Sequence, residues 1–292
     1  MATGLITRLL GGFYRVVDER GTIHETRARG KFRHRAEAPV VGDVVEFAEQ
    51  SGEEIGWITK IHPRKNFLLR PGVSNVDQVL LLITPIDPVC NLSLTDRLLT
   101  RYACEGIDVR ILINKANLDP EGAQKLRERF EATGYEVYVI NLLAEDATDL
   151  VRPLLTQKKT ALAGVSGAGK STLTSLVVEA DVQTSHVSEK TRRGRHTTRH
   201  NEIFLTRDGD FLFDTPGFSS LDLEDFDSEE IQEGFIEFRP YEGLCRFKDC
   251  LHLKEPGCAI QEAVEEGSIL LDRYEEYKTI VSELKEKEKR KW

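Results

Sequence analysis

The segment GVSGAGKS, residues 164–171, constrains the fold of this chain more than any other feature. It fits the pattern G-x-x-x-x-G-K-[ST] completely, follows the apolar run TALA and opens a helix-like stretch. Glycines allow backbone N–H groups to turn towards a phosphate, a lysine adds positive charge, and the final hydroxyl can bind Mg²⁺. The sequence therefore predicts a nucleoside triphosphate site at a strand-to-helix turn. The residues expected to bind the nucleotide here are Gly164, Val165, Ser166, Gly167, Ala168, Gly169, Lys170, Ser171 and Thr172, with Ser171 also on magnesium.

Two downstream segments fit the same chemistry. Asp214-Thr-Pro-Gly217 ends the apolar run FLF, so Asp214 is expected to hold Mg²⁺ through water. The N–H of Gly217 is then available to the γ-phosphate, although such a tetrapeptide can also be a plain turn. Between the two lies the basic, aperiodic segment 190–198, which is typical of a loop that orders on a γ-phosphate. Thr197 or Thr198 is expected to complete the Mg²⁺ coordination, and a solvated basic loop is the alternative.

A candidate base-reading loop lies upstream, in LINKANLD, residues 112–119. Asn114-Lys115-Ala-Asn117 resembles the guanine-recognition pattern Asn-Lys-x-Asp, and it follows the strand-like run VRILIN. Asn114 is expected to hold the loop and touch the purine, and the stem of Lys115 to cover the ring. In a conventional GTPase this loop comes after the phosphate-binding loop, which in this chain is the segment 164–171 and is called the phosphate loop below. The reversed order predicts a circularly permuted domain, which is possible where chain ends lie close together on the surface.

Three regions follow from the sequence pattern. Residues 1–70 hold short β-type runs separated by glycine, which favours a five-stranded OB-like barrel. Residues 71–218 alternate strand and helix, the pattern of a three-layer α/β domain with a mostly parallel sheet. Residues 219–292 read as mostly helical and end in a charged amphipathic helix.

The last region also carries a cysteine cluster, C-x₄-C-x-H-x₅-C. Four soft ligands within such a short, polar stretch predict a closed tetrahedral zinc site of structural type. The expected ligands are Cys245, Cys250, His252 and Cys258. Buried reduced cysteines are the alternative, and we expect that for Cys90 and Cys104, which lie on apolar segments.

Composition places few further limits on function. The 292 residues are 40% hydrophobic and 30% charged, with a net charge of -9 and no apolar run long enough to span a membrane. The amino terminus lacks the pattern of a signal peptide, so we expect a cytoplasmic protein. The acidic net charge argues against a general nucleic-acid coat. Basic residues nevertheless alternate along one segment of the predicted barrel: Arg27, Arg29, Lys31, Arg33 and Arg35.

This set of motifs in this order, between a barrel and a cysteine cluster, resembles the bacterial ribosome small subunit-dependent GTPase A family (RsgA, also called YjeQ). The resemblance rests on NKAN at 114–117, GVSGAGKST at 164–172, RGRHTT at 193–198, DTPG at 214–217 and the cysteine cluster, and it covers essentially the whole chain. It implies GTP hydrolysis with Mg²⁺ and a low intrinsic rate, stimulated by the small ribosomal subunit late in that subunit's maturation. It also implies contacts to ribosomal RNA, one structural zinc ion and a monomeric protein.

The resemblance further suggests His196 as the residue that holds the attacking water, because Phe218 stands where many GTPases carry a glutamine. Contact of His196 with phosphate or RNA is the alternative. The sequence departs from the family at Asn117, since an aspartate usually ends the base loop. An asparagine replaces one acceptor by a donor, which opposes a donor of guanine. The preference for guanine is therefore expected to weaken in favour of xanthine. Asp119 lies two residues too late for the same role.

Two other classes of function fit parts of the sequence. A P-loop ATPase or small-molecule kinase unrelated to ribosomes would lack the NKAN loop and would not need a basic barrel. A nucleic-acid-binding module with a degenerate nucleotide site would not hydrolyse triphosphates.

Overall fold

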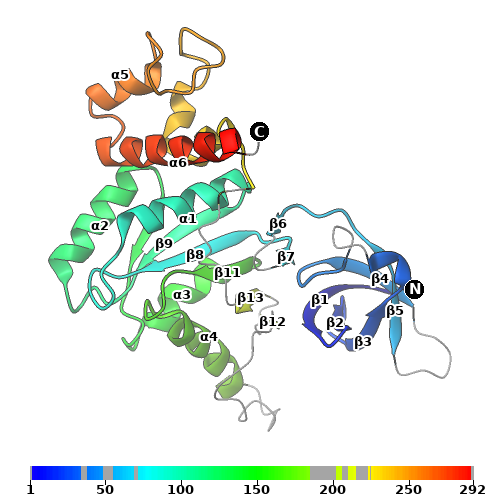
Figure 1. The fold of residues 1–292 in the computed structure, drawn as a ribbon. Coiled ribbons are helices and arrows are strands. Elements are labelled where there is room, and N and C mark those ends of the chain that lie inside the picture. Colours follow the sequence, from blue (N-terminus) through cyan, green and yellow to red (C-terminus); the bar gives the residue numbers. More distant parts are fainter. Residues whose placement is uncertain are drawn as a thin grey trace. The chain divides into compact units, whose positions relative to one another are not determined.

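The computed structural model describes residues 2–33, 38–48, 55–68, 72–184, 202–205, 210–214, 223 and 225–290 (Figure 1). The chain divides into two compact units. One comprises residues 1–79, 142–163 and 169–218, and the other comprises residues 80–141, 164–168 and 219–292. Most of the points at which the chain passes from one unit to the other therefore lie within residues 71–218, the segment predicted as the nucleotide-binding domain.

The amino-terminal part of the first unit is the predicted five-stranded barrel. Its strands follow the order β1-β2-β3-β5-β4, and β4 pairs with β1 to close it. Buried and partly exposed residues alternate along β4, so Val45 and Phe47 point into the barrel interior. The strands are β1 (Ala2–Leu10), β2 (Phe13–Asp18), β3 (Ile23–Ala28), β4 (Val44–Ala48) and β5 (Gly56–Ile61), with a short 3₁₀ helix η1 (Gly30–Arg33) after β3.

The exit segment, which follows β5 and includes Arg64 and Ser74, is held to the barrel by hydrogen bonds. The buried carboxylate of Asp43 accepts two hydrogen bonds from Arg64, at 2.7 and 2.8 Å, and one from the Ser74 hydroxyl at 2.6 Å. Strands β6 (Phe67–Leu68) and β7 (Val73–Ser74) form a small hairpin of their own. The exit segment is thus part of the barrel's structure rather than a loose linker.

The rest of the first unit contains the strand that leads to the phosphate loop. Strand β11 pairs in parallel with β13, and β13 pairs antiparallel with β12. Strand β12 in turn pairs with β1 of the barrel. The elements are α3 (Ala147–Leu155), β11 (Lys159–Ala163), α4 (Lys170–Thr184), β12 (Glu202–Leu205) and β13 (Phe211–Asp214).

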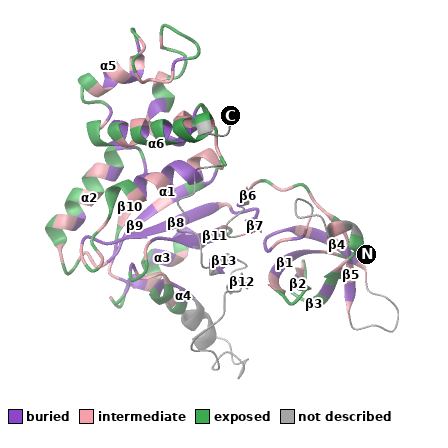
Figure 2. Ribbon diagram, in the orientation of Figure 1, coloured by how far each residue is buried: buried purple, intermediate pink, exposed green. Residues whose placement is uncertain are grey.

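The second unit begins within strand β8 (Gln78–Ile83) and opens with an α/β segment. All six residues of β8 are buried, and Figure 2 shows this strand in purple along its length. Strand β9 (Asp108–Ile113) lies between β8 and the parallel β10 (Glu136–Val139). Helix α1 (Leu92–Cys104) follows β8 and α2 (Pro120–Ala132) follows β9. The alternation of buried strand and helix confirms the α/β class predicted for this segment.

The carboxy-terminal part is helical, as predicted. It consists of η3 (Glu230–Gly234), η4 (Ile236–Tyr241), α5 (Ala259–Glu265) and α6 (Leu271–Arg290). Phe235, Phe238 and Tyr277 pack at its centre, with ring centroids 5.1–5.3 Å apart. Helix α6 lies across α1 and α2 on the side away from the strands (Figure 1). Among the described residues, no helix combines the length and apolarity that a membrane span needs.

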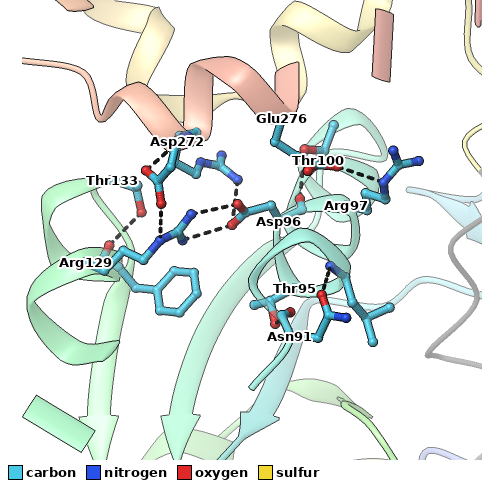
Figure 3. A network of polar contacts seen from close by, with 12 residues as sticks. Asn91, Thr95, Asp96, Arg97, Thr100, Arg129, Thr133, Asp272 and Glu276 are labelled. Atoms are coloured by element: carbon cyan, nitrogen blue, oxygen red, sulfur yellow. Dashed lines mark hydrogen bonds and ion pairs between the residues drawn. The ribbon is translucent and has the colours of Figure 1, made fainter. Parts of the chain in front are cut away.

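A buried ionic network joins α6 to α1 and α2 (Figure 3). The Asp96 carboxylate, with only 2% of its side chain exposed, accepts two hydrogen bonds from Arg129, at 3.0 and 2.8 Å. It also lies 3.1 Å from Arg273, which is fully buried and bonded to Glu237 at 2.7 Å. Burial opposes the charge on Arg273, but the Glu237 and Asp96 carboxylates outweigh it and raise the pKa of the guanidinium. Arg129 also binds Asp272 at the start of α6, at 2.9 Å.

We expect Asp96→Asn to lower the free energy of unfolding by about 3–5 kcal/mol, because breaking a buried pair leaves buried guanidinium charge uncompensated. Denaturant titration monitored by circular dichroism measures this difference. The matched control is Glu131→Gln, which removes the exposed pair with Arg127 on α2 and should cost less than about 1 kcal/mol. Equal, small effects of the two changes would contradict a stabilising role for the network.

Candidate nucleotide and metal sites

The phosphate loop is built by a turn between β11 and α4. Gly164, Gly167 and Gly169 have φ values of 128°, 86° and 113°, a region that side-chain-bearing residues rarely adopt. A Cβ on Gly164 would also lie 2.2 Å from the carbonyl oxygen of Leu82 on β8. Glycine is therefore required at this position by both conformation and space. Helix α4 begins at Lys170, and the first N–H groups of a helix lack intrahelical partners and can bind phosphate.

The candidate base loop contacts this turn. Asn114 follows the end of β9, is buried, and donates from Nδ2 to the carbonyl oxygen of Ala168 at 3.0 Å. Its backbone N–H donates to Ile83 of β8 at 2.9 Å. Two loops that are 54 residues apart in sequence are thus joined by a side chain of the predicted motif.

The remaining residues of the loop form a turn. Lys115 has a φ of 61°, and its ammonium donates a hydrogen bond to the carbonyl oxygen of Asp87 in the loop after β8. The N–H of Leu118 donates to the Lys115 carbonyl at 3.0 Å, and Asn117, within this turn, is exposed. Asp119 caps helix α2, accepting a hydrogen bond from the N–H of Gly122 at 2.9 Å.

Comparison with known families agrees with these features. A model for the RsgA GTPase matches residues 61–224, more than half of the chain, and a model for the RsgA N-terminal domain matches residues 3–58. The chain belongs to the RsgA family. Its members in this comparison are small ribosomal subunit biogenesis GTPases, and this chain is accordingly a GTP hydrolase.

Individual relatives match over nearly their whole length. The chain is 39% identical to the small ribosomal subunit biogenesis GTPase RsgA of Agathobacter rectalis, covering 98% of this chain and 99% of that one. It is also 39% identical to RsgA of Bacillus velezensis, over 99% of this chain and all of the other. Among solved structures it resembles YloQ, described as a circularly permuted GTPase, with 33% identity, a TM-score of 0.82 and 98% and 96% of the two chains covered. YjeQ from Thermotoga maritima gives 31% identity and a TM-score of 0.82, with 97% and 98% covered.

The order of the motifs follows from this relationship. RsgA proteins are circularly permuted GTPases, so a base loop that precedes the phosphate loop is expected of the family. The prediction of a permuted domain is confirmed.

The structure also brings the four predicted zinc ligands together. One ligand atom each from Cys245, Cys250, His252 and Cys258 lies within 4.8 Å of the others. The sulfur atoms of Cys245 and Cys258 are 4.0 Å apart, close to the separation of about 3.8 Å that two Zn–S bonds of about 2.3 Å require in a tetrahedron. Nδ1 of His252 lies 3.3 Å from the Cys258 sulfur. The donor set and its spacing therefore fit a metal ion such as zinc.

Protonation in this cluster depends on burial. Burial raises the pKa of the Cys250 thiol to about 12 and also raises that of Cys258, so a metal must displace protons to bind. Burial lowers the pKa of His252, which keeps the imidazole neutral, as a metal ligand must be.

Residues outside the motif support the cluster. The side-chain oxygen of Gln232 lies 3.1 Å from Nε2 of His252, which leaves Nδ1 facing the sulfur atoms. Tyr274 and Tyr277 of α6 donate to the carbonyl oxygens of His252 and Leu251, at 2.6 and 2.8 Å. Sequence analysis missed these three residues, because no spacing rule connects η3 or α6 to the cysteine motif.

Other predicted residues are only partly covered by the structure. Asp214 is the last residue of β13. His196, Thr197, Thr198 and Gly217 lie outside the described residues, as does Phe218. Of the two remaining cysteines, which were expected to be buried and reduced, Cys104 is free but only partly buried, and burial raises the pKa of its thiol to about 12. Cys90 is also partly buried.

We expect one zinc ion per chain and, in Cys250→Ser, loss of that ion and faster proteolysis within residues 219–292, because metal binding contributes folding energy. Elemental analysis and limited proteolysis measure these effects. Cys90→Ser, which changes a cysteine outside the cluster, should retain the metal and the protease resistance. A metal-free wild-type protein that resists proteolysis equally well would contradict a structural role for zinc.

Proposed function

We propose that this RsgA-family protein hydrolyses GTP with Mg²⁺ at a rate stimulated by the small ribosomal subunit, and that it acts late in the maturation of that subunit. The bond from Asn114 to the phosphate loop carries this proposal, because it joins a base-reading loop to a phosphate loop in one structure. A P-loop kinase or ATPase has no need for such a loop, and the two family models that match the chain are both RsgA models. Its relatives are named for small subunit biogenesis, which supports the choice of partner.

The proposed phosphate-binding group is the loop 164–172. Backbone N–H groups of the glycine-rich turn bind the phosphate oxygens, with Val165, Ser166, Ala168 and Thr172 contributing to the same loop. Lys170 places its ammonium charge near the β- and γ-phosphates, and Ser171 binds Mg²⁺. The positive φ values of Gly164, Gly167 and Gly169 support this use of the turn.

The proposed hydrolytic group comes from the segments after the phosphate loop. Asp214 holds Mg²⁺ through water, Thr197 or Thr198 completes its coordination, and the Gly217 N–H binds the γ-phosphate. His196 orients the attacking water, a role that the phenyl ring of Phe218 cannot take.

The barrel and the zinc module are the proposed contacts to ribosomal RNA. On β3 the exposed Arg27 stacks over the ring of Phe13, 4.2 Å from its centroid, and Arg29 is exposed just beyond the strand. Arginine side chains of this kind bind phosphate backbones without reading sequence. We propose a cytoplasmic monomer for the free protein.

The test is GTP hydrolysis measured with and without purified small subunits, with large subunits as the control. We expect strong stimulation by small subunits only, and a stimulation that weakens as salt rises, because counterions compete for the RNA. Lys170→Ala should abolish hydrolysis, whereas His196→Ala should slow it while nucleotide binding stays near the wild-type level. Equal rates with and without small subunits would contradict the proposed partner, and full activity in His196→Ala would remove that residue from the reaction.

A further inference from the structure

Position 117 is the feature of the base loop that differs from a guanine-recognition motif. The loop is fixed at both ends: Asn114 is bonded to Ala168 and Ile83, and Asp119 begins helix α2. Asn117 lies in the exposed turn between them. Asn117 therefore occupies the position of the base-reading aspartate at the usual spacing, with an amide in place of a carboxylate.

The chemistry of the amide decides which purine edge it can pair with. Guanine presents two donors, its N1–H and its 2-amino group, which suit the two acceptor oxygens of an aspartate. An asparagine offers one acceptor and one donor, so its NH₂ would face the 2-amino group. Xanthine carries an oxygen at position 2 and hypoxanthine carries no polar group there, and both keep the N1–H. With either base, the NH₂ group of Asn117 does not face another hydrogen-bond donor.

Asp119 is the nearest carboxylate in sequence that could compensate, but the structure assigns it another task. Its carboxylate accepts the hydrogen bond from the Gly122 N–H, and its carbonyl oxygen accepts from Ala123 at 3.0 Å. A Cβ on Gly122 would lie 2.2 Å from the second carboxylate oxygen of Asp119, which shows how closely this side chain lies against the first turn of α2. Asp119 is thus held on the helix and does not replace the missing acceptor.

We infer that Asn117 gives this GTPase a relaxed base preference, so that xanthine and hypoxanthine nucleotides bind at least as well as guanine nucleotides. This inference rests on the proposed function, since it concerns the base of the same triphosphate. The substitution Asn117→Asp removes the donor–donor mismatch and should raise the affinity for GTP by about one to two orders of magnitude. Xanthosine triphosphate should bind more weakly to that variant, because its 2-oxygen would face a carboxylate. Adenosine triphosphate should bind poorly to both proteins, because its 6-amino group meets donors of the loop.

The experiment is competition of GTP, xanthosine, inosine and adenosine triphosphates against a fluorescent GTP analogue, with Mg²⁺, on the full-length wild-type protein and Asn117→Asp. GTP and inosine triphosphate differ only in the 2-amino group of the purine, so the ratio of their affinities measures the contact that residue 117 makes with that group. We expect a ratio of about one or less for the wild type and at least about ten for the variant. The control is Asp119→Asn, which keeps a residue able to cap α2 and should leave all affinities unchanged.

Each result separates the inference from the proposed function. Tight GTP binding with the same ratio in wild type and Asn117→Asp would overturn the relaxed preference and leave the GTPase intact. A large loss of GTP affinity in Asp119→Asn would show that Asp119 supplies the acceptor, which also overturns it. If none of the triphosphates displaced the analogue from either protein, the proposed function itself would fail.

Discussion

The hydrogen bond from Asn114 to the carbonyl oxygen of Ala168 is the contact on which the proposed nucleotide site depends. It ties the loop after β9 to the turn after β11, although the chain visits them in an order opposite to that of a conventional GTPase. A hydrogen bond of this kind contributes about 0.5–1.5 kcal/mol to stability. The close approach of Gly164 to Leu82 holds the same turn against β8. A permuted chain can thus rebuild the site because these contacts depend on strand neighbours and not on chain order.

The second unit extends this arrangement to the zinc module. Helix α2 starts at the base loop, capped by Asp119, and carries Arg129 in its last turn. Arg129 binds Asp96 on α1 and Asp272 on α6, and Arg97 of α1 binds both Glu276 and Glu283 of α6. Tyr274 and Tyr277, also on α6, hold the cysteine loop. Helices α2 and α6 together therefore connect the loop that contains Asn114 to the cysteine cluster.

Local patterns predicted much of this structure. The barrel strands, the alternation of strand and helix over residues 71–218 and the cysteine spacing were all visible in the sequence, because alternation, periodicity and motif spacing are properties of neighbouring residues. The capping role of Asp119 could also have been read from the aspartate that precedes Pro120, since a proline often begins a helix after such a cap. The network around Asp96 and the support of His252 by Gln232 could not. Their partners come from distant helices, and only the tertiary packing of α6 brings them together.

The most direct test of the account is the affinity of Asn114→Ala for GTP with Mg²⁺, measured by calorimetry on protein whose fold is checked by circular dichroism. If the base loop and the phosphate loop are held together as described, affinity should fall by about tenfold or more, because both the loop anchor and a contact to the purine are lost. Unchanged affinity in a folded variant would contradict the claim that Asn114 joins the two loops into a nucleotide site.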